Sequence, residues 1–187
     1  MSPSGWEQNA VYLQSGNPET EDTPTLMQGG LLGSRFTIMT GVSRAQGTLT
    51  TPAPRSKRYQ LVKTDSTMSV APFPGATAYW ADKSTYLVTT VNTNLNAVAG
   101  VFNNNVTKGN YTCVQVTGPC YVKFVDADST AAAVSDQVIG SATVGKANRL
   151  ATGTAPTTIA FGRVSTPLTK LASEARVLVD LDVPETT

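Results

Sequence analysis

Residues 175–183 alternate between apolar and mostly charged positions, and this short stretch constrains the fold more than any other. The apolar positions are Ala175, Val177, Val179, Leu181 and Val183, and between them lie Arg176, Leu178, Asp180 and Asp182. A period of two places successive side chains on opposite faces of a strand, whereas a helix needs a period of 3.6. The stretch therefore predicts a half-buried β-strand with one face in water.

Further strand-like runs recur from residue 76 onward. Their β-branched and aromatic residues concentrate at 85–91, 98–102, 111–117, 120–125, 137–140 and 158–163. Helix signals are scarce, and we expect one short helical turn that starts at Ser165-Thr166-Pro167 and runs to Glu174. The pattern predicts an all-β fold, a small β-sandwich or barrel, over residues 76–187.

Residues 1–75 follow a different pattern, in which glycine and proline interrupt the chain repeatedly. Short β-leaning pieces at 35–39 and 58–62 lie between these breakers. Short strands separated by long irregular stretches are typical of an extended segment. We interpret residues 1–75 as an extended, largely irregular N-terminal arm, with Pro72-Phe73-Pro74-Gly75 at the junction.

Gly118-Pro119 separates two strand-like runs and predicts the turn of a hairpin. With that register, Cys120 faces Thr117 and Cys113 faces Phe124, so the thiols are not partners. We expect both cysteines to be small packing residues. The first residues have neither a basic start nor an apolar run, and no stretch has the length of a membrane span. These features favour synthesis in a reducing cytoplasm.

The chain contains no histidine and two cysteines. Nucleophile–histidine catalysis, histidine-bound zinc and four-cysteine zinc sites are therefore excluded. Residues 140–147 nearly match the phosphate-binding loop, but Ala147 lacks the hydroxyl that holds Mg²⁺, and no amphipathic helix follows. A glycine turn between strands explains this motif better.

Two acidic patterns have equally simple explanations. Residues 126–130 resemble the start of a calcium loop, but Ala131 and Gln137 stand where glycine and a bidentate glutamate are needed. Asp180 and Asp182 on one strand face suit the wet side of a strand better than a catalytic pair. We predict no catalytic residue, no cofactor and no metal site.

Charge is segregated along the chain. Residues 1–34 hold four acidic and no basic residues, whereas residues 35–63 hold six basic and no acidic ones. A nucleic-acid-binding segment needs aromatic side chains for base stacking among its basic residues, and here only Phe36 and Tyr59 lie nearby. We favour a protein partner for this basic segment over nucleic acid; a solvated segment without a role is the third interpretation.

The β-domain resembles the small β-rich decoration (cement) proteins of tailed-bacteriophage heads. The resemblance covers roughly residues 79–183. The matching stretches follow one another along the chain at 79–83, 98–102, 109–111, 114–116, 122–124, 135–139, 145–147, 161–164 and 175–179.

This resemblance implies a non-enzymatic virion protein that binds the outside of the capsid and stabilises the head. Its partner would be the major capsid protein, with no nucleic acid, membrane or small-molecule substrate. A homo-oligomer is expected, and capsid symmetry favours a trimer. On residue type, the arm would contact its partner through apolar anchors and basic groups: Trp6, Tyr12, Leu31, Leu32, Phe36, Arg35, Arg44, Arg55, Lys57 and Arg58.

Two other functions fit the same sequence. A head–tail joining or tail structural protein would share the composition but occupy one vertex of the virion. A glycan-binding β-module would instead stack sugar rings on exposed aromatic side chains, for which Tyr79, Trp80 and Tyr86 are the candidates.

Overall fold

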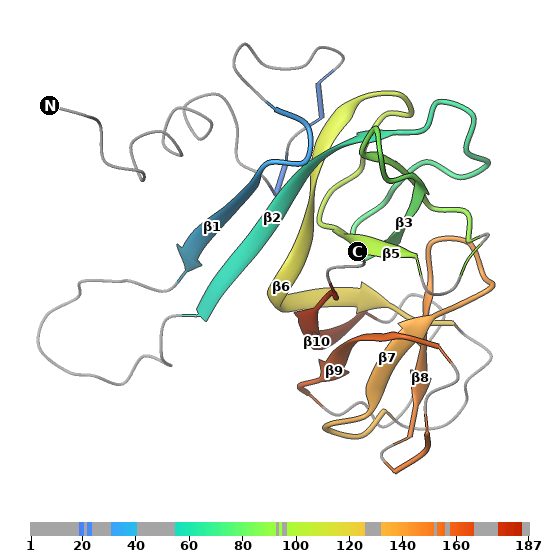
Figure 1. The fold of residues 1–187 in the computed structure, drawn as a ribbon. Coiled ribbons are helices and arrows are strands. Elements are labelled where there is room, and N and C mark those ends of the chain that lie inside the picture. Colours follow the sequence, from blue (N-terminus) through green and yellow to red (C-terminus); the bar gives the residue numbers. More distant parts are fainter. Residues whose placement is uncertain are drawn as a thin grey trace, which may run out of the picture.

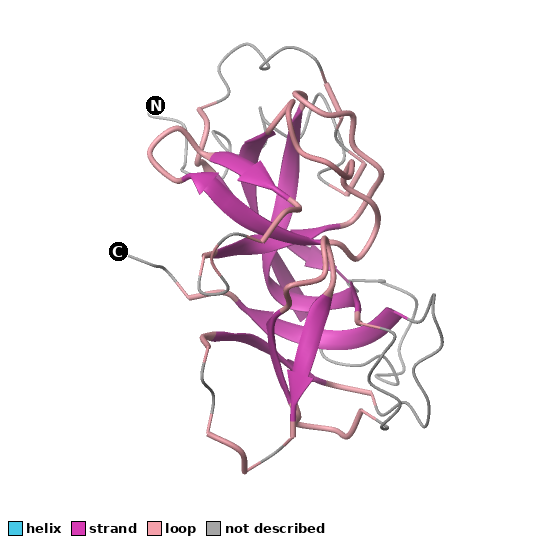
Figure 2. Cartoon of the chain, turned by 90° about the vertical axis from the view of Figure 1, so that its right-hand side faces the viewer, coloured by secondary structure: helices cyan, strands magenta, loops and turns pink. Residues whose placement is uncertain are grey.

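A computed structural model of the chain describes residues 19–20, 22–23, 31–40, 55–92, 94, 97–125, 132–151, 153–155, 158–166 and 176–184. These residues form β-strands and no helix, which confirms the expected all-β class (Figures 1 and 2). The strands are β1 (Arg35–Thr40), β2 (Arg55–Thr64), β3 (Thr77–Asp82), β4 (Leu87–Thr89), β5 (Val98–Phe102), β6 (Tyr111–Lys123), β7 (Gln137–Gly140), β8 (Ala147–Leu150), β9 (Ala160–Val164) and β10 (Arg176–Asp182).

Five strands close into a barrel. They follow the order β2-β4-β3-β5-β6, and the ring closes because β2 also pairs with β6. β2 and β4 are parallel, while the other neighbours in the ring are antiparallel. Closure leaves the ring strands without open edges along their paired lengths, and it encloses a core between them.

β6 belongs to both halves of the molecule. Its first part pairs with β2, and residues 117–123 pair with β10. From there an antiparallel sheet continues in the order β10-β9-β7-β8. Figure 1 shows β6 leaving the barrel through a sharp bend and running into this second sheet.

The hairpin expected at Gly118-Pro119 is wrong, because the strand passes through these residues without reversing. Gly118 has a left-handed backbone with φ of 88°. A Cβ atom at this position would lie 2.3 Å from the carbonyl oxygen of Ser56, so only glycine allows β2 to pass this close. The glycine therefore bends a continuous strand where the local sequence predicts a turn.

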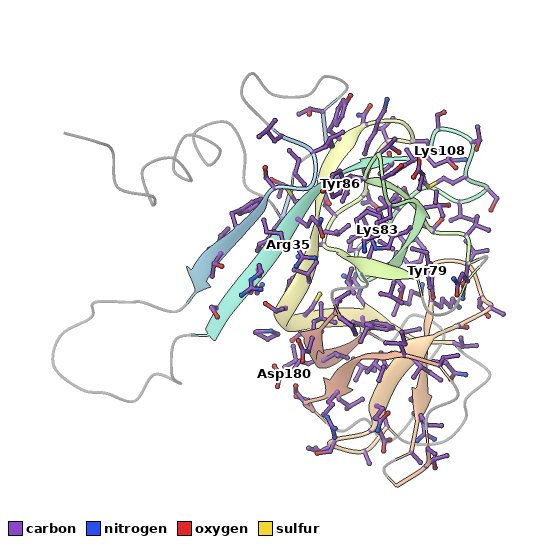
Figure 3. The ribbon with its side chains drawn as sticks, viewed as in Figure 1. Arg35, Tyr79, Lys83, Tyr86, Lys108 and Asp180 are labelled. Atoms are coloured by element: carbon purple, nitrogen blue, oxygen red, sulfur yellow. The ribbon has the colours of Figure 1, made fainter. Side chains whose placement is uncertain are left out.

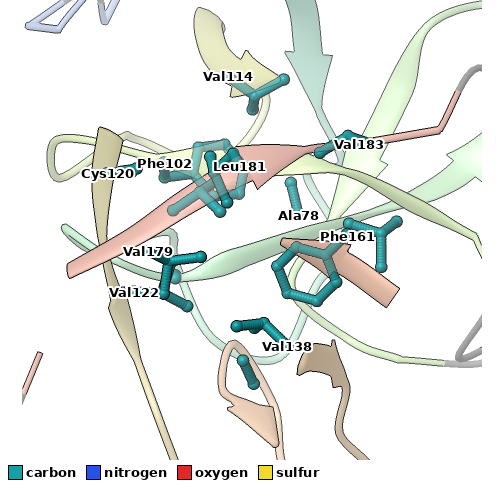
Figure 4. Packing of buried hydrophobic residues seen from close by; sticks show 14 of the residues in the cluster. Ala78, Phe102, Val114, Cys120, Val122, Val138, Phe161, Val179, Leu181 and Val183 are labelled. Atoms are coloured by element: carbon teal, nitrogen blue, oxygen red, sulfur yellow. The ribbon is translucent and has the colours of Figure 1, made fainter. Parts of the chain in front are cut away.

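One hydrophobic cluster runs from the barrel into the second sheet. Figure 4 shows its central part, where Phe102, Val122, Phe161 and Leu181 pack together. The alternation predicted for residues 175–183 is confirmed in β10, whose burial pattern runs exposed, buried, intermediate, buried, exposed, buried, exposed. Its inner side chains fill this core, and its charged side chains face water.

The barrel begins earlier in the chain than the sequence indicates. The sequence pattern places residues 55–64 in the arm, but they form β2, which pairs with β4 and β6 as well as with β1. The physical reason is that Val62 and Thr64 reach the barrel core only through pairings with strands far along the chain. The glycine turn expected within residues 140–147 is confirmed, because residues 141–146 join β7 to β8. The helical turn expected over residues 165–174 and the acidic stretch at 126–130 lie largely or wholly outside the described residues.

A short N-terminal piece is attached to the barrel. Thr23 forms a two-way backbone pairing with Tyr111, with N···O distances of 3.1 and 2.8 Å. The carboxylate of Asp22 accepts hydrogen bonds from Thr107 and from the side-chain amide of Asn110. This part of the predicted arm is therefore docked on the start of β6.

Candidate partner-binding surface

The antiparallel pair β1–β2 forms a ribbon that projects from the barrel (Figure 1). Directly opposite residues in such a pair point to the same face. Phe36 lies opposite Tyr59 and Ile38 opposite Lys57, so these four side chains share one face. The other face carries Arg35, Thr37, Arg58 and Gln60 in the same way. The two faces differ in their chemistry and in what covers them.

Glu19 covers the first face. Its carboxylate accepts a 2.5 Å hydrogen bond from Lys57 Nζ and a 2.6 Å hydrogen bond from the Tyr59 hydroxyl. Phe36 stacks on the Tyr59 ring at a centroid distance of 5.8 Å. Burial by itself would raise the pKa of Glu19, but the bonds from Lys57 and Tyr59 outweigh it and hold that pKa below its ordinary value. Burial and the adjacent carboxylate raise the pKa of Tyr59.

Part of the charge segregation is thus satisfied within the chain. Glu19 comes from the acidic segment and Lys57 from the basic one. Oppositely charged segments that are neighbours in sequence can fold back on one another, and composition alone does not distinguish this from contact with a partner. Lys57, expected to bind a partner, is already paired, and Phe36, an expected apolar anchor, is half-buried against Tyr59.

The second face is basic and exposed. Arg35 and Arg58 are both exposed and lie on diagonal positions of the β1–β2 register. The Arg35 guanidinium donates two 3.3 Å hydrogen bonds to the side-chain oxygen of Gln60, which is only 4% exposed. That buried amide orients the Arg35 side chain. Just before β1, Leu31 is 70% exposed and Leu32 is half-buried.

Of the remaining expected contacts, Trp6, Tyr12 and Arg44 lie outside the described residues. Arg55 is described through its backbone, which pairs with Thr40 at the tip of the ribbon. Of the expected contacts in the described part of the chain, Arg35 and Arg58 are exposed on the ribbon and Leu31 is exposed shortly before it.

β1 also has an open edge. It stands at one end of the strand order, and its outer side pairs with no other strand in the described part of the chain. An open edge presents backbone N–H and C=O groups that a strand from another protein can pair with. The ribbon therefore combines an open edge with a basic face.

The aromatic residues considered for glycan stacking do not all lie at the surface. Tyr79 is 1% exposed, and its hydroxyl accepts a 3.1 Å hydrogen bond from the Ser141 backbone, so its proposed role in stacking is wrong. Trp80 and Tyr86 are half-buried and meet edge to face at 6.2 Å. The Tyr79 hydroxyl lies against the turn between β7 and β8, where it also contacts the carbonyl oxygens of Ser141 and Lys146 at 3.5 Å.

Sequence reasoning missed a buried ion pair in the second sheet. Asp136, directly before β7, lies 3.0 Å from the guanidinium of Arg149 on β8 and also accepts a bond from the Ala133 backbone. Ser135 next to it has a positive φ of 74°, unusual for a non-glycine residue. No local signal pairs two residues 13 positions apart across a long hairpin.

Asp180 and Asp182 are exposed on β10, as the strand pattern predicts. No group of three or more cysteine, aspartate or glutamate side chains suited to hold a metal ion occurs among the described residues. Cys113 and Cys120 are buried and not disulfide-bonded. Burial raises the pKa of the Cys120 thiol to about 12, which makes it a poor nucleophile. No helix in the described part of the chain has the length and apolar character to cross a membrane.

No protein-family model matches the chain. No curated protein matches it either. Among solved structures, it is similar to the N base of the head fiber protein gp8.5 of bacteriophage phi29. The identity is 13%, the match covers 69% of this chain and 97% of the other, and the TM-score is 0.43. A TM-score below 0.5 at this identity does not establish a shared fold.

Proposed function

We propose that the chain is a structural protein of a bacteriophage virion, which binds the outer surface of the capsid and stabilises the head without catalysing a reaction. The observation that carries this proposal is the β1–β2 ribbon, with its open edge and basic face. The resemblance of residues 79–183 to head decoration proteins also supports the proposal.

The chemistry of the ribbon suggests how it binds. Arg35 and Arg58 suit acidic side chains of the major capsid protein, and Leu31 suits an apolar pocket beside them. An extended capsid segment that adds to the edge of β1 would place acidic side chains over the basic face. Many copies on a lattice add avidity, so each contact can be weak.

The proposal is tested with heads that lack this protein. The chain is mixed with them and sedimented, and the bound fraction is compared for the wild type, Leu31→Asp and Arg58→Glu. Both substituted side chains are exposed, so the variants are expected to fold normally. We expect each to lower affinity on the order of tenfold, as the loss of a charge-assisted contact or of an apolar anchor predicts.

Lys108→Glu is the matched control, because Lys108 is exposed and lies in the loop before β6, away from the ribbon. Equal binding by all four proteins would show that the ribbon does not bind the capsid. No binding by the wild type would contradict capsid binding itself. Antibody labelling of intact virions then separates two sites: label spread over the head supports a decoration role, and label at one vertex supports a head–tail or tail role instead.

A further inference from the structure

A hollow of about 360 Å³ opens at one end of the barrel. β3 ends there and β4 and β5 begin there, because β3 is antiparallel to both. Its lining includes Gly33, Arg35, Gln60, Trp80, Lys83 and Tyr86. Its volume lies within the range of about 300–1,000 Å³ common for ligand sites, which often occupy the mouths of β-barrels.

Tyr86 is held in this hollow against a conformational cost. Its φ is +54°, a left-handed backbone that bulky side chains rarely adopt. Gly33 lies directly against its ring, so close that a Cβ on residue 33 would be 2.1 Å from the ring carbon Cζ. A strained aromatic residue kept in place by a glycine contact is typical of a site where geometry matters for function.

Trp80 gives the hollow an aromatic surface. It packs on the barrel core and meets Tyr86 edge to face, so its ring is fixed in orientation. A fixed aromatic face carries partial negative charge and attracts the C–H groups on the flat side of a sugar ring. The hollow therefore has a rigid surface for stacking.

Two cationic side chains line the same hollow. Lys83 is exposed in the turn between β3 and β4, and Arg35 is oriented by the buried Gln60. Figure 3 shows Arg35, Lys83 and Tyr86 gathered on one side of the barrel. Asp82 precedes Lys83, but its carboxylate accepts bonds from Ser84 and Thr85 within the turn. The hollow thus combines aromatic faces with positive charge.

From this combination we propose that the barrel end binds a sugar ring that carries a carboxylate. The ring stacks on Trp80, and the carboxylate lies between Lys83 and Arg35. Both cations can donate charge-assisted hydrogen bonds to it, which are stronger than hydrogen bonds between neutral groups. An acidic side chain of a peptide would satisfy the cations but has no flat ring face for Trp80. The site shares Arg35 with the ribbon proposed to bind the capsid, and it also uses Trp80 and Lys83, which the ribbon does not.

The test titrates the isolated chain with galacturonic acid and glucuronic acid oligosaccharides, with galactose and glucose oligosaccharides as neutral counterparts, and with a penta-glutamate peptide. Binding is followed by calorimetry and by saturation-transfer NMR. Lys83→Gln removes one cation, Trp80→Leu keeps an apolar contact with the core but removes the aromatic face, and Lys108→Gln is the control at the other end of β5.

We expect the acidic sugars to bind at least tenfold more tightly than the neutral ones, with a loss on the order of tenfold in Lys83→Gln and in Trp80→Leu and none in Lys108→Gln. If Trp80→Leu does not fold, Lys83→Gln and the neutral sugars decide the matter. Equal binding of acidic and neutral sugars, binding of the peptide alone, or no binding at all would overturn the proposal. Because no heads are present, these outcomes are separate from a failure of capsid binding.

Discussion

The hydroxyl of Tyr59 donates a 2.6 Å hydrogen bond to the carboxylate of Glu19, which lies 40 residues earlier in the chain. The same carboxylate accepts a bond from Lys57. The contact ties the acidic N-terminal segment to the first barrel strand. It also changes the meaning of the charge pattern, because a basic side chain expected to bind a partner is used inside the chain.

Glu19→Gln should lower stability by about 1 kcal/mol or less, because the carboxylate is partly exposed and solvent screens it. The pKa of Glu19 is below its ordinary value of 4.5 in the folded chain, so its contribution is complete above that value and is lost as the pH falls through the lower, folded value. The difference between wild type and variant in urea unfolding should therefore shrink in acid. A difference that grows there would contradict the contact.

Gly33→Ala should destabilise the chain by more than Gly153→Ala. Both glycines have a positive φ, of 83° and 88°, so alanine at either site costs about 1–2 kcal/mol in backbone strain. At residue 33 the added methyl also collides with the Tyr86 ring, whereas residue 153 has open space. The collision should cost about 1–3 kcal/mol more. Thermal unfolding of both variants measures this difference in stability. Equal losses of stability would show that the Tyr86 ring moves aside freely.

Asp136→Asn should lower stability by about 3–5 kcal/mol, because it removes the carboxylate from a buried ion pair and leaves the Arg149 charge without it. Asp182→Asn, at an exposed position of β10, is the control and should change stability by about 0.5 kcal/mol or less. Chemical unfolding at neutral pH compares them. Similar small losses would mean that water reaches the Asp136 side chain.

Both cysteines should resist modification in the folded protein. Cys113 and Cys120 are buried, and the pKa of about 12 at Cys120 leaves almost no thiolate at pH 8. Titration with a thiol reagent should detect no thiol within minutes in native buffer and both in urea without reductant. Cysteines that do not react in urea would indicate a disulfide. Fast reaction in native buffer would show that the barrel opens and exposes the thiols.

The strands were predictable where the pattern is local. The alternation of β10 and the apolar run of β5 depend on neighbouring residues, and both strands lie where the pattern places them. The basic character of residues 35–63 was also recognisable, since charge is read directly from the sequence, but the pairing of β1 with β2 was not. Of the residues that line the hollow at the barrel end, the sequence pointed to Trp80 and Tyr86 as candidates for stacking and to Arg35 as a partner contact, but not to Gly33 or Lys83 as site residues. These residues meet only because their strands pair.

The sequence by itself determined strands such as β5 and β10 and which side chains carry the charge, because β-propensity and a period of two are local properties. It did not mark β3 or β8 as strands. Tertiary structure decided how they combine. Gly118 bends a strand instead of reversing it, because β10 pairs across it while β2 passes close beside it. Residues 55–64 became a barrel strand because β6 lies within reach to pair with them. The energy of such pairings comes from partners far along the chain, which no short stretch of sequence contains.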